Sequence, residues 1–299
     1  MAGSRQSRQK RRRRKMKRMR NCILFLLLVL AAVFLLTRYL EQDVEEGKGI
    51  FAGFKDEQEE TLEIVTPVKW TEDEVRAKIT ALAAENDAYG AIYANYDQYP
   101  ADMLLALVNN PEMLSFVSGY LESDGSVKGG LEWNERNQDF PLFLQWDERW
   151  GYAPYGESNI GLAGCGPTCL AMVLYSMTGN EKITPDVIAQ YSMDNSYYVE
   201  GTGTSWALMS DVCTNYGISS YQITNTEEDL KDALDKGRPL ICSMGPGDFT
   251  TAGHFIMIYG YNEEGFFVND PNSRARSAKR WSYDEIGDQI RAIWVFYES

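Results

Sequence analysis

The chain has 299 residues, room for about two domains at roughly 150 residues each, and its 44% apolar and 12% aromatic content excludes disorder of the whole chain. Its net charge of −14 is unevenly distributed: residues 1–20 hold eleven of the 29 basic residues and none of the 43 acidic residues, so the rest offers no basic stripe and we expect no nucleic-acid partner. Five cysteines and one histidine exclude a disulfide-framework mini-protein and a multi-histidine metal site, and we expect no metal or cofactor.

A membrane-spanning helix is expected over residues 21–40, after the basic cytoplasmic tail. Only one charged residue interrupts this apolar run, close to its end, and Cys22–Leu40 would extend roughly 28 Å as a helix, enough to cross a bilayer. A cleaved signal peptide is the alternative, with Val29 and Ala31 before the cleavage site, but the apolar run continues beyond them. The charges of residues 1–20 predict a single-pass cell-membrane protein that contacts anionic lipid, with its amino end in the cytoplasm and its body outside.

Two segments of different character follow. Residues 41–66 are rich in acids and glycine, which predicts an acidic linker without a fixed fold. Residues 67–130 contain apolar positions at helical spacing and are expected to form a small helical segment. One helix is predicted over 72–86, and two short helices are predicted to begin at Pro100 and Pro111, where proline suits the first helical position.

The remaining residues, 131–299, are predicted to form one α+β domain. Helices are expected over about 167–177, from 185, over about 205–217 and over 226–237, and strands over 220–224, 239–244, 254–261, 266–269 and 291–297. Because helices come first and most strands last, we expect N-terminal helices packed on an antiparallel sheet.

Two residues in this domain carry most of the predicted chemistry. His254 is the only histidine, and it begins an expected strand after a glycine-containing loop, where a side chain can face a cleft. Cys165 lies between glycines just before the expected helix 167–177, where unpaired N–H groups and the helix dipole favour the nucleophilic thiolate. The glycines on both sides are interpreted as room for a substrate. A thiol at a helix start and a later histidine at a strand start are typical of nucleophilic catalysis.

The other cysteines of this domain suggest a structural role. Cys169, Cys213 and Cys242 fall inside expected helices or strands and are interpreted as small buried apolar residues. A zinc site on Cys165 and Cys169 would lack its remaining ligands.

A third group should orient the imidazole of His254. Asn269 and Asp270 end the following strand, and side-chain alternation gives Asp270 for a hairpin loop with an odd number of residues and Asn269 for an even loop. The residues alone leave this choice open. Gln145 ends an extended segment, and its amide is a candidate oxyanion donor, although glutamine at such a place more often faces solvent.

Four motifs in order, PLFLQWDERWGYAPYG, GCGPTCLAMVL, GHFIMIYGY and FFVNDPNS, resemble the papain-like family of bacteriocin-processing, double-glycine leader peptidases. The resemblance covers roughly residues 140–297 and is closest to the free-standing extracytoplasmic branch of Gram-positive bacteria. It implies a papain-like cysteine peptidase fold with Cys165 as nucleophile, His254 as general base and acid, Asp270 as orienting acid and Gln145 as oxyanion donor. The loop EGTGTSW, residues 200–206, also resembles a loop of this branch and is a candidate cleft wall.

The well-studied members of that family belong to ABC exporters and cut after Gly-Gly, whereas this chain has one apolar span and no Walker motif. The predicted function is therefore a membrane-anchored extracytoplasmic cysteine hydrolase that cleaves peptide or amide bonds through a thioester, with a peptide or cell-wall peptide as substrate. One alternative is a non-catalytic papain-like binding or scaffold module. Another is a thioester-based acyltransferase or crosslinking enzyme at the cell wall.

Overall fold

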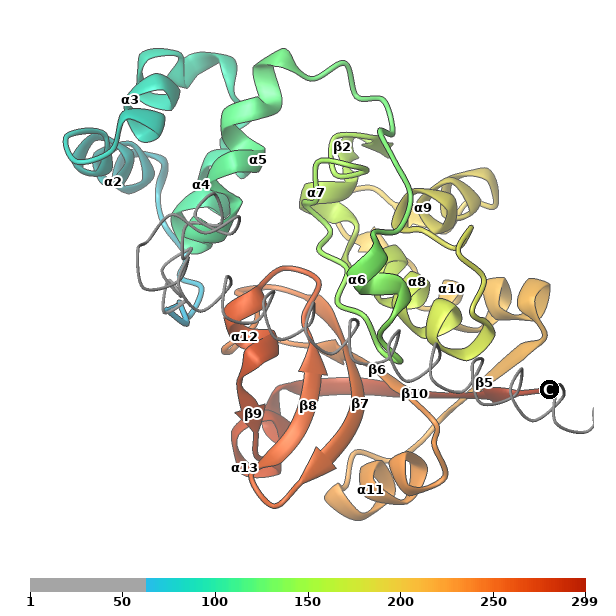
Figure 1. Ribbon diagram of the computed structural model, residues 1–299. Helices are drawn as coiled ribbons and strands as arrows, with labels where there is room; N and C mark the ends of the chain where they lie inside the picture. Colours follow the sequence, from blue (N-terminus) through green and yellow to red (C-terminus); the bar gives the residue numbers. More distant parts are fainter. Residues whose placement is uncertain (1–62) are drawn as a thin grey trace, which may run out of the picture. The chain divides into compact units, whose positions relative to one another are not determined.

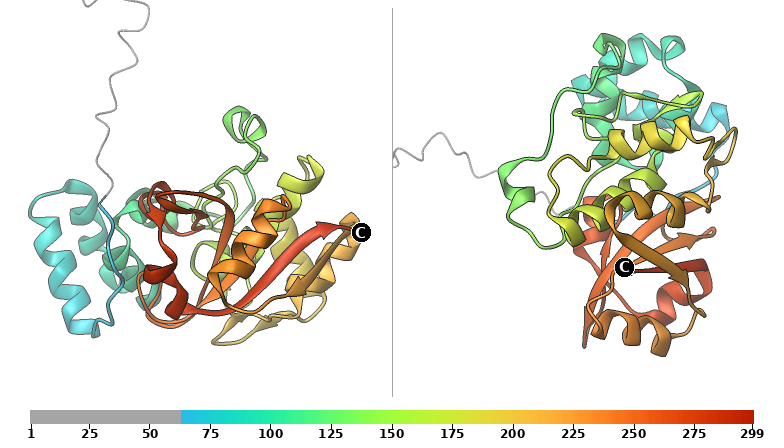
Figure 2. Two further views of the ribbon diagram at one scale, coloured as in Figure 1. Left: turned by 90° about the horizontal axis from the view of Figure 1, so that it is seen from below. Right: turned by 90° about the vertical axis from the view of Figure 1, so that its right-hand side faces the viewer.

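The computed structural model describes residues 63–299 (Figures 1 and 2). The predicted basic tail, the predicted span over 21–40 and almost all of the predicted linker lie outside the described residues. Within 63–299, no helix combines the length and the apolar character needed to cross a bilayer.

The first part of the described chain is helical. Its helices are α2 (Glu72–Ala83), α3 (Asp87–Ala94), α4 (Ala101–Asn109) and α5 (Leu114–Gly119), with a 3-10 turn at Pro111–Met113. A capping box between Thr71 and Glu74 starts α2. The helix ends earlier than predicted, because Asn86 caps the unpredicted α3. Pro111 opens its turn at the first position, whereas Pro100 is the residue before α4.

The helical segment shares a core with the chain that leads to Cys165. Buried residues of α2–α5 pack together with Leu144, Trp146 and Tyr152. The rings of Phe116 and Tyr152 stack with centroids 4.6 Å apart, and the Tyr152 hydroxyl donates to the Phe116 carbonyl. Aromatic burial of this kind fixes the helical segment on residues 144–152.

A six-stranded antiparallel sheet forms the second part. Its strands are β5 (Ile218–Gln222), β6 (Leu240–Met244), β7 (His254–Asn262), β8 (Gly265–Asn269), β9 (Arg280–Trp281) and β10 (Ile290–Glu298), in the order β5-β10-β6-β7-β8-β9. Every neighbouring pair is antiparallel. The predicted class of mixed helix and sheet is confirmed, although β9 was not predicted.

Helices and small strand pairs surround this sheet (Figure 1). They are α6 (Trp133–Arg136), α7 (Ile160–Ala163), α8 (Cys165–Thr178), α9 (Pro185–Asp194), α10 (Leu208–Asp211), α11 (Glu227–Asp235), α12 (Arg274–Ala278) and α13 (Tyr283–Ile286), with the pairs β1 (Pro154–Tyr155) and β2 (Ser158–Asn159), and β3 (Tyr198–Val199) and β4 (Gly203–Thr204). The helix predicted over 205–217 is split into α10 and a 3-10 stretch that ends at Gly217. α12 was not predicted.

Two apolar cores hold the sheet between helices. One core joins α8 to Ile241 of β6 and Met257 of β7. The other core joins α11 and α13 to the next residue of β6, Cys242, and to the preceding residue of β7, Ile256. Adjacent strand residues therefore belong to opposite cores, as pleating requires. All residues of α8 from Gly166 to Tyr175 are buried, so the start of this helix has a fixed position.

Candidate active site

Cys165 is the first residue of α8 and the only partly exposed cysteine within residues 63–299. Cys169, Cys213 and Cys242 are buried, as predicted. Burial raises the pKa of the Cys213 thiol to about 12 and raises the pKa values of Cys169 and Cys242 as well. Since the thiolate is the attacking species, these three thiols are poor nucleophiles and Cys165 is the candidate.

The flanking glycines have a different role from the one predicted. A methyl group at Gly164 would meet the Ile160 carbonyl oxygen at 2.5 Å, and one at Gly166 would meet the Thr204 side chain at 2.8 Å. These glycines allow α7, α8 and β4 to pack closely. The interpretation that they leave room for a substrate is wrong.

His254 lies at the start of β7. Its Nε2 atom is 2.8 Å from Asp270 Oδ1, and it lines the same cleft as Cys165. His254 is 8% exposed and Asp270 is fully buried. Because Nε2 faces the carboxylate, Nδ1 is the nitrogen left for the thiol.

This environment favours a charged imidazolium. Burial alone lowers the pKa of His254, but the Asp270 carboxylate and the Cys165 thiol outweigh it and raise the pKa to about 9. Burial likewise raises the pKa of Asp270, but the cations Arg276 and His254 reverse this and lower it to about 2. The carboxylate is therefore ionised throughout the neutral range, and His254 holds a proton there.

The turn between β7 and β8 contains two residues, because Asn262 pairs with Gly265. This is an even loop, for which the alternation argument gives Asn269 on the face of His254. The structure instead places Asp270 beside His254. The rule that an even loop presents Asn269 to His254 therefore fails in this hairpin.

A β-bulge explains the difference. Pairing shifts by one residue between Ile258 and Gly260, which leaves Tyr259 without a partner. A shift of one residue exchanges the two faces of a strand, so Asp270 rather than its neighbour lies beside His254. The Tyr259 ring stacks on Phe140 at 5.1 Å, which holds the bulge in place.

Asn269 has another partner. Its Nδ2 atom donates to the carbonyl oxygens of Phe140 and Pro141, at 3.2 and 3.0 Å. The amide thus fastens the extended segment before Gln145 to the end of β8.

Gln145 is buried next to α7, the short helix that precedes Cys165. Its Nε2 atom donates to the Gly161 carbonyl at 2.8 Å, and its backbone N–H donates to the Pro271 carbonyl at 2.7 Å. Oε1 has no hydrogen-bond partner among the described residues. Gln145 does not line the cleft beside Cys165. One proton of Nε2 is used in the bond to Gly161, so only the other proton could reach an oxyanion. The role of Gln145 as an oxyanion donor stays a prediction.

Arg276 is a site residue that the sequence did not indicate. It is 1% exposed, and its Nε atom donates to Asp270 Oδ2, on the side of the carboxylate away from His254. A buried guanidinium keeps this carboxylate ionised, at a high cost in desolvation. In the sequence, Arg276 lies in the basic stretch RARSAKR, which is typical of a solvent-exposed segment, so its burial could not be predicted.

A cleft of about 450 Å³ opens beside Cys165 and His254. The EGTGTSW loop forms part of its wall, as predicted, through Gly201 to Thr204 and Trp206. Asp102 of α4 and Glu157 also line it, and no Lys or Arg is among the lining residues. The close approach of Glu200 raises the pKa of Glu157, which indicates a locally negative wall.

Comparisons with known proteins place the chain in a family. The peptidase domain of Streptococcus ComA, a bifunctional ABC transporter involved in quorum sensing, is 20% identical, with a TM-score of 0.35 over 45% of this chain and 90% of that domain. A protein described as a C39-like peptidase from Bacillus anthracis is 17% identical, with a TM-score of 0.33 over 55% of this chain and 96% of its own. No curated protein matches the chain. Residues 137–298 match the Peptidase_C39 like family, and the chain therefore belongs to that family of cysteine peptidase relatives.

Proposed function

We propose that the chain is a cysteine hydrolase that cleaves peptide or amide bonds with a triad of Cys165, His254 and Asp270. The observation that carries this proposal is the position of His254, which bonds Asp270 at 2.8 Å and lines the same open cleft as Cys165. A proton held on His254 and a nucleophile at a helix start support a thiolate–imidazolium pair. Membership of the Peptidase_C39 like family supports the same chemistry.

In the proposed reaction, the Cys165 sulfur attacks the carbonyl carbon of the scissile amide. His254 gives its proton to the leaving amine, the C–N bond breaks and a thioester remains. Water then attacks the thioester, His254 accepts a proton from that water, and the carboxylic acid product leaves while the thiolate is restored. The N–H groups at the start of α8 and the Gln145 amide are the proposed donors to the oxyanion.

The proposed location is the outer face of the cell membrane, with the amino end of the chain in the cytoplasm. The apolar run over 21–40 and the basic residues 1–20 support this orientation. It would place the chain in the free-standing extracytoplasmic branch of the family, where peptides and cell-wall peptides are the available substrates.

The cleft favours substrates with a positive charge near the scissile bond. Asp102 and Glu157 face the cleft without a basic residue among the lining, so a cationic side chain or amine would neutralise the wall, whereas an acidic side chain would be repelled.

Peptide-library cleavage by the full chain tests the proposal. Wild type and Cys165→Ser are each incubated with a mixture of basic, neutral and acidic peptides, and the products are identified by mass spectrometry with and without an added amine acceptor. We expect wild type alone to produce cleaved peptides, preferentially the basic ones. Products of amine transfer without hydrolysis would favour an acyltransferase, and equal cleavage by Cys165→Ser would refute the nucleophile.

A further inference from the structure

The turn that carries Asp270, residues 270–276, is fastened to the helical segment 67–130. We propose that Asn110 and Glu112 of that segment, here called the latch, are positioning residues that hold this turn and thereby keep Asp270 against His254. The inference rests on the proposed function for its catalytic meaning. It gives residues 67–130 a part in the active site.

Glu112 makes the densest set of contacts in the latch. Its carboxylate accepts hydrogen bonds from Ser273 Oγ at 2.6 Å, from the Arg274 backbone N–H at 2.8 Å and from the Ala275 backbone N–H at 3.2 Å. These are the cap residue and the first turn of α12, where N–H groups lack partners within the helix. One carboxylate from another part of the chain thus fixes the start of α12.

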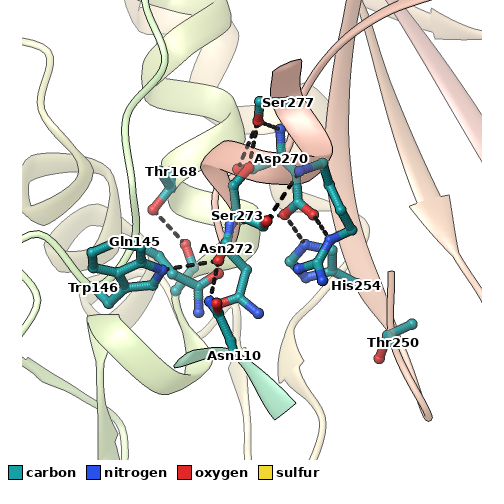
Figure 3. A network of polar contacts seen from close by, with 12 residues as sticks. Asn110, Gln145, Trp146, Thr168, Thr250, His254, Asp270, Asn272, Ser273 and Ser277 are labelled. Atoms are coloured by element: carbon teal, nitrogen blue, oxygen red, sulfur yellow. Dashed lines mark hydrogen bonds and ion pairs between the residues drawn. The ribbon is translucent and has the colours of Figure 1, made fainter. Parts of the chain in front are cut away.

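Asn110 holds the other half of the turn. Its Nδ2 atom donates to the Asn272 carbonyl oxygen, which also accepts from Trp146 Nε1 at 3.0 Å (Figure 3). Its Oδ1 atom accepts from the Glu112 backbone N–H at 3.2 Å, so the two latch residues support each other. Asn110 is 4% exposed, and its bond to the turn is therefore shielded from water.

The turn determines where Asp270 lies. Asp270 Oδ1 accepts from the Asn272 N–H at 2.8 Å, and Oδ2 accepts from Arg276 Nε. The Asp270 backbone N–H donates to Ser277 Oγ at 2.9 Å. Asp270 also bonds His254, but all its other partners belong to the turn or to α12; Figure 3 shows two of them, Ser277 and Asn272. A shift of the turn would therefore carry the carboxylate away from His254.

A third tie fixes the cation behind the carboxylate. Arg276 Nη1 donates to the Val65 carbonyl at 3.2 Å, and Nη2 is buried without a partner among the described residues. The guanidinium is thus held by Asp270 and by the chain just before the helical segment. A movement of α12 would displace Arg276, and it would thereby change how the Asp270 carboxylate is shared between Arg276 and His254.

The latch lies outside the part of the chain that matches the family, residues 137–298. Asn110 and Glu112 are separated from their partners by 161 to 163 residues of sequence. Asp102 of the same segment also lines the cleft. The helical segment therefore supplies both a wall of the cleft and the support of the orienting acid.

Loosening the latch should act on the catalytic step rather than on substrate binding. The ionisable groups that face His254 are Asp270 and Cys165, with Arg276 behind the carboxylate. A displaced Asp270 would leave the imidazolium less stabilised and less well oriented. Misplacement on the order of 1 Å can lower a rate by about 100-fold.

Two nearly isosteric substitutions in the full chain test the inference. Glu112→Gln removes the charge and one acceptor from the start of α12. Asn110→Asp keeps the acceptor for the Glu112 N–H but replaces the donor to Asn272. Glu74→Gln is the matched control, because Glu74 also caps a helix of this segment but bonds only Thr71. Each variant is labelled with ¹³C at the histidine ring, and the single resonance of His254 is titrated by NMR alongside kcat and KM.

We expect the double variant Asn110→Asp/Glu112→Gln to remain folded, to titrate at least one pH unit below wild type and to lose kcat about 10- to 100-fold with little change in KM. Glu74→Gln should behave as wild type. An unchanged His254 titration in a folded double variant would overturn the latch. If no variant and no wild type cleaves peptides but the titration still shifts, the proposed function fails while the latch stands.

Discussion

Replacing Asp270 by Asn removes the one negative charge that bonds His254 directly. The pKa of His254 is raised from 6.5 to about 9, a difference that corresponds to about 3 kcal/mol in favour of the imidazolium. Without the carboxylate, burial still lowers the pKa and only the Cys165 thiol raises it, so we expect a value of about 6.5 or lower. At pH 8 the protonated fraction would then fall from about 90% to about 3%, roughly 30-fold.

NMR of the full chain measures this directly, because the chain has only one histidine and its labelled ring gives one signal. Asn269→Ala should leave the titration midpoint where it is. Asp270→Asn also leaves Arg276 buried without its ion-pair partner, which should cost about 3–5 kcal/mol of stability. The double variant Asp270→Asn/Arg276→Gln removes that unpaired cation. It should therefore regain stability, but its His254 should still titrate as in Asp270→Asn. A wild-type midpoint near 6.5 that Asp270→Asn does not change would refute the reasoning.

Three further predictions follow from the site and the sequence. Gln145→Ala should fold normally and lose kcat by about 100- to 1,000-fold, as expected for an oxyanion donor, whereas an unchanged kcat would make Gln145 a packing residue. Because the folded pKa of His254 lies above its ordinary value, its stabilising contribution should be complete below about pH 6.5 and lost as the pH rises through 9. Denaturant titrations should show a loss of about 3 kcal/mol over that range that is absent in His254→Gln. The full chain should stay in the membrane fraction after a high-salt wash, and a new amino terminus near Ala32 would instead indicate a cleaved signal peptide.

Several helix boundaries could be predicted because their signals are local. Thr184 with Pro185, Thr226, and the glycines at 179 and 217 mark helix ends through contacts within a few residues. The split of the helix predicted over 205–217 and the short α12 depend on packing that no local pattern contains.

The chemical site was only partly accessible from the sequence. Cys165 and His254 stand out because one lies at a helix start and the other is the only histidine. Asp270 depends on the bulge at Tyr259, whose ring packs on Phe140 more than a hundred residues away, so side-chain alternation alone could not choose between Asn269 and Asp270. Buried Arg276 is set by contacts between distant segments and has no sequence signal.

The rate at which iodoacetamide alkylates Cys165 at pH 6 tests the thiolate–imidazolium pair most directly, and it needs no knowledge of the substrate. An ordinary cysteine is only about 0.3% thiolate at this pH. We predict that Cys165 of the full chain reacts at pH 6 before the buried cysteines, and roughly 100-fold faster than in a folded His254→Gln variant. Equal rates in the two proteins, or alkylation of a buried cysteine before Cys165, would contradict the account.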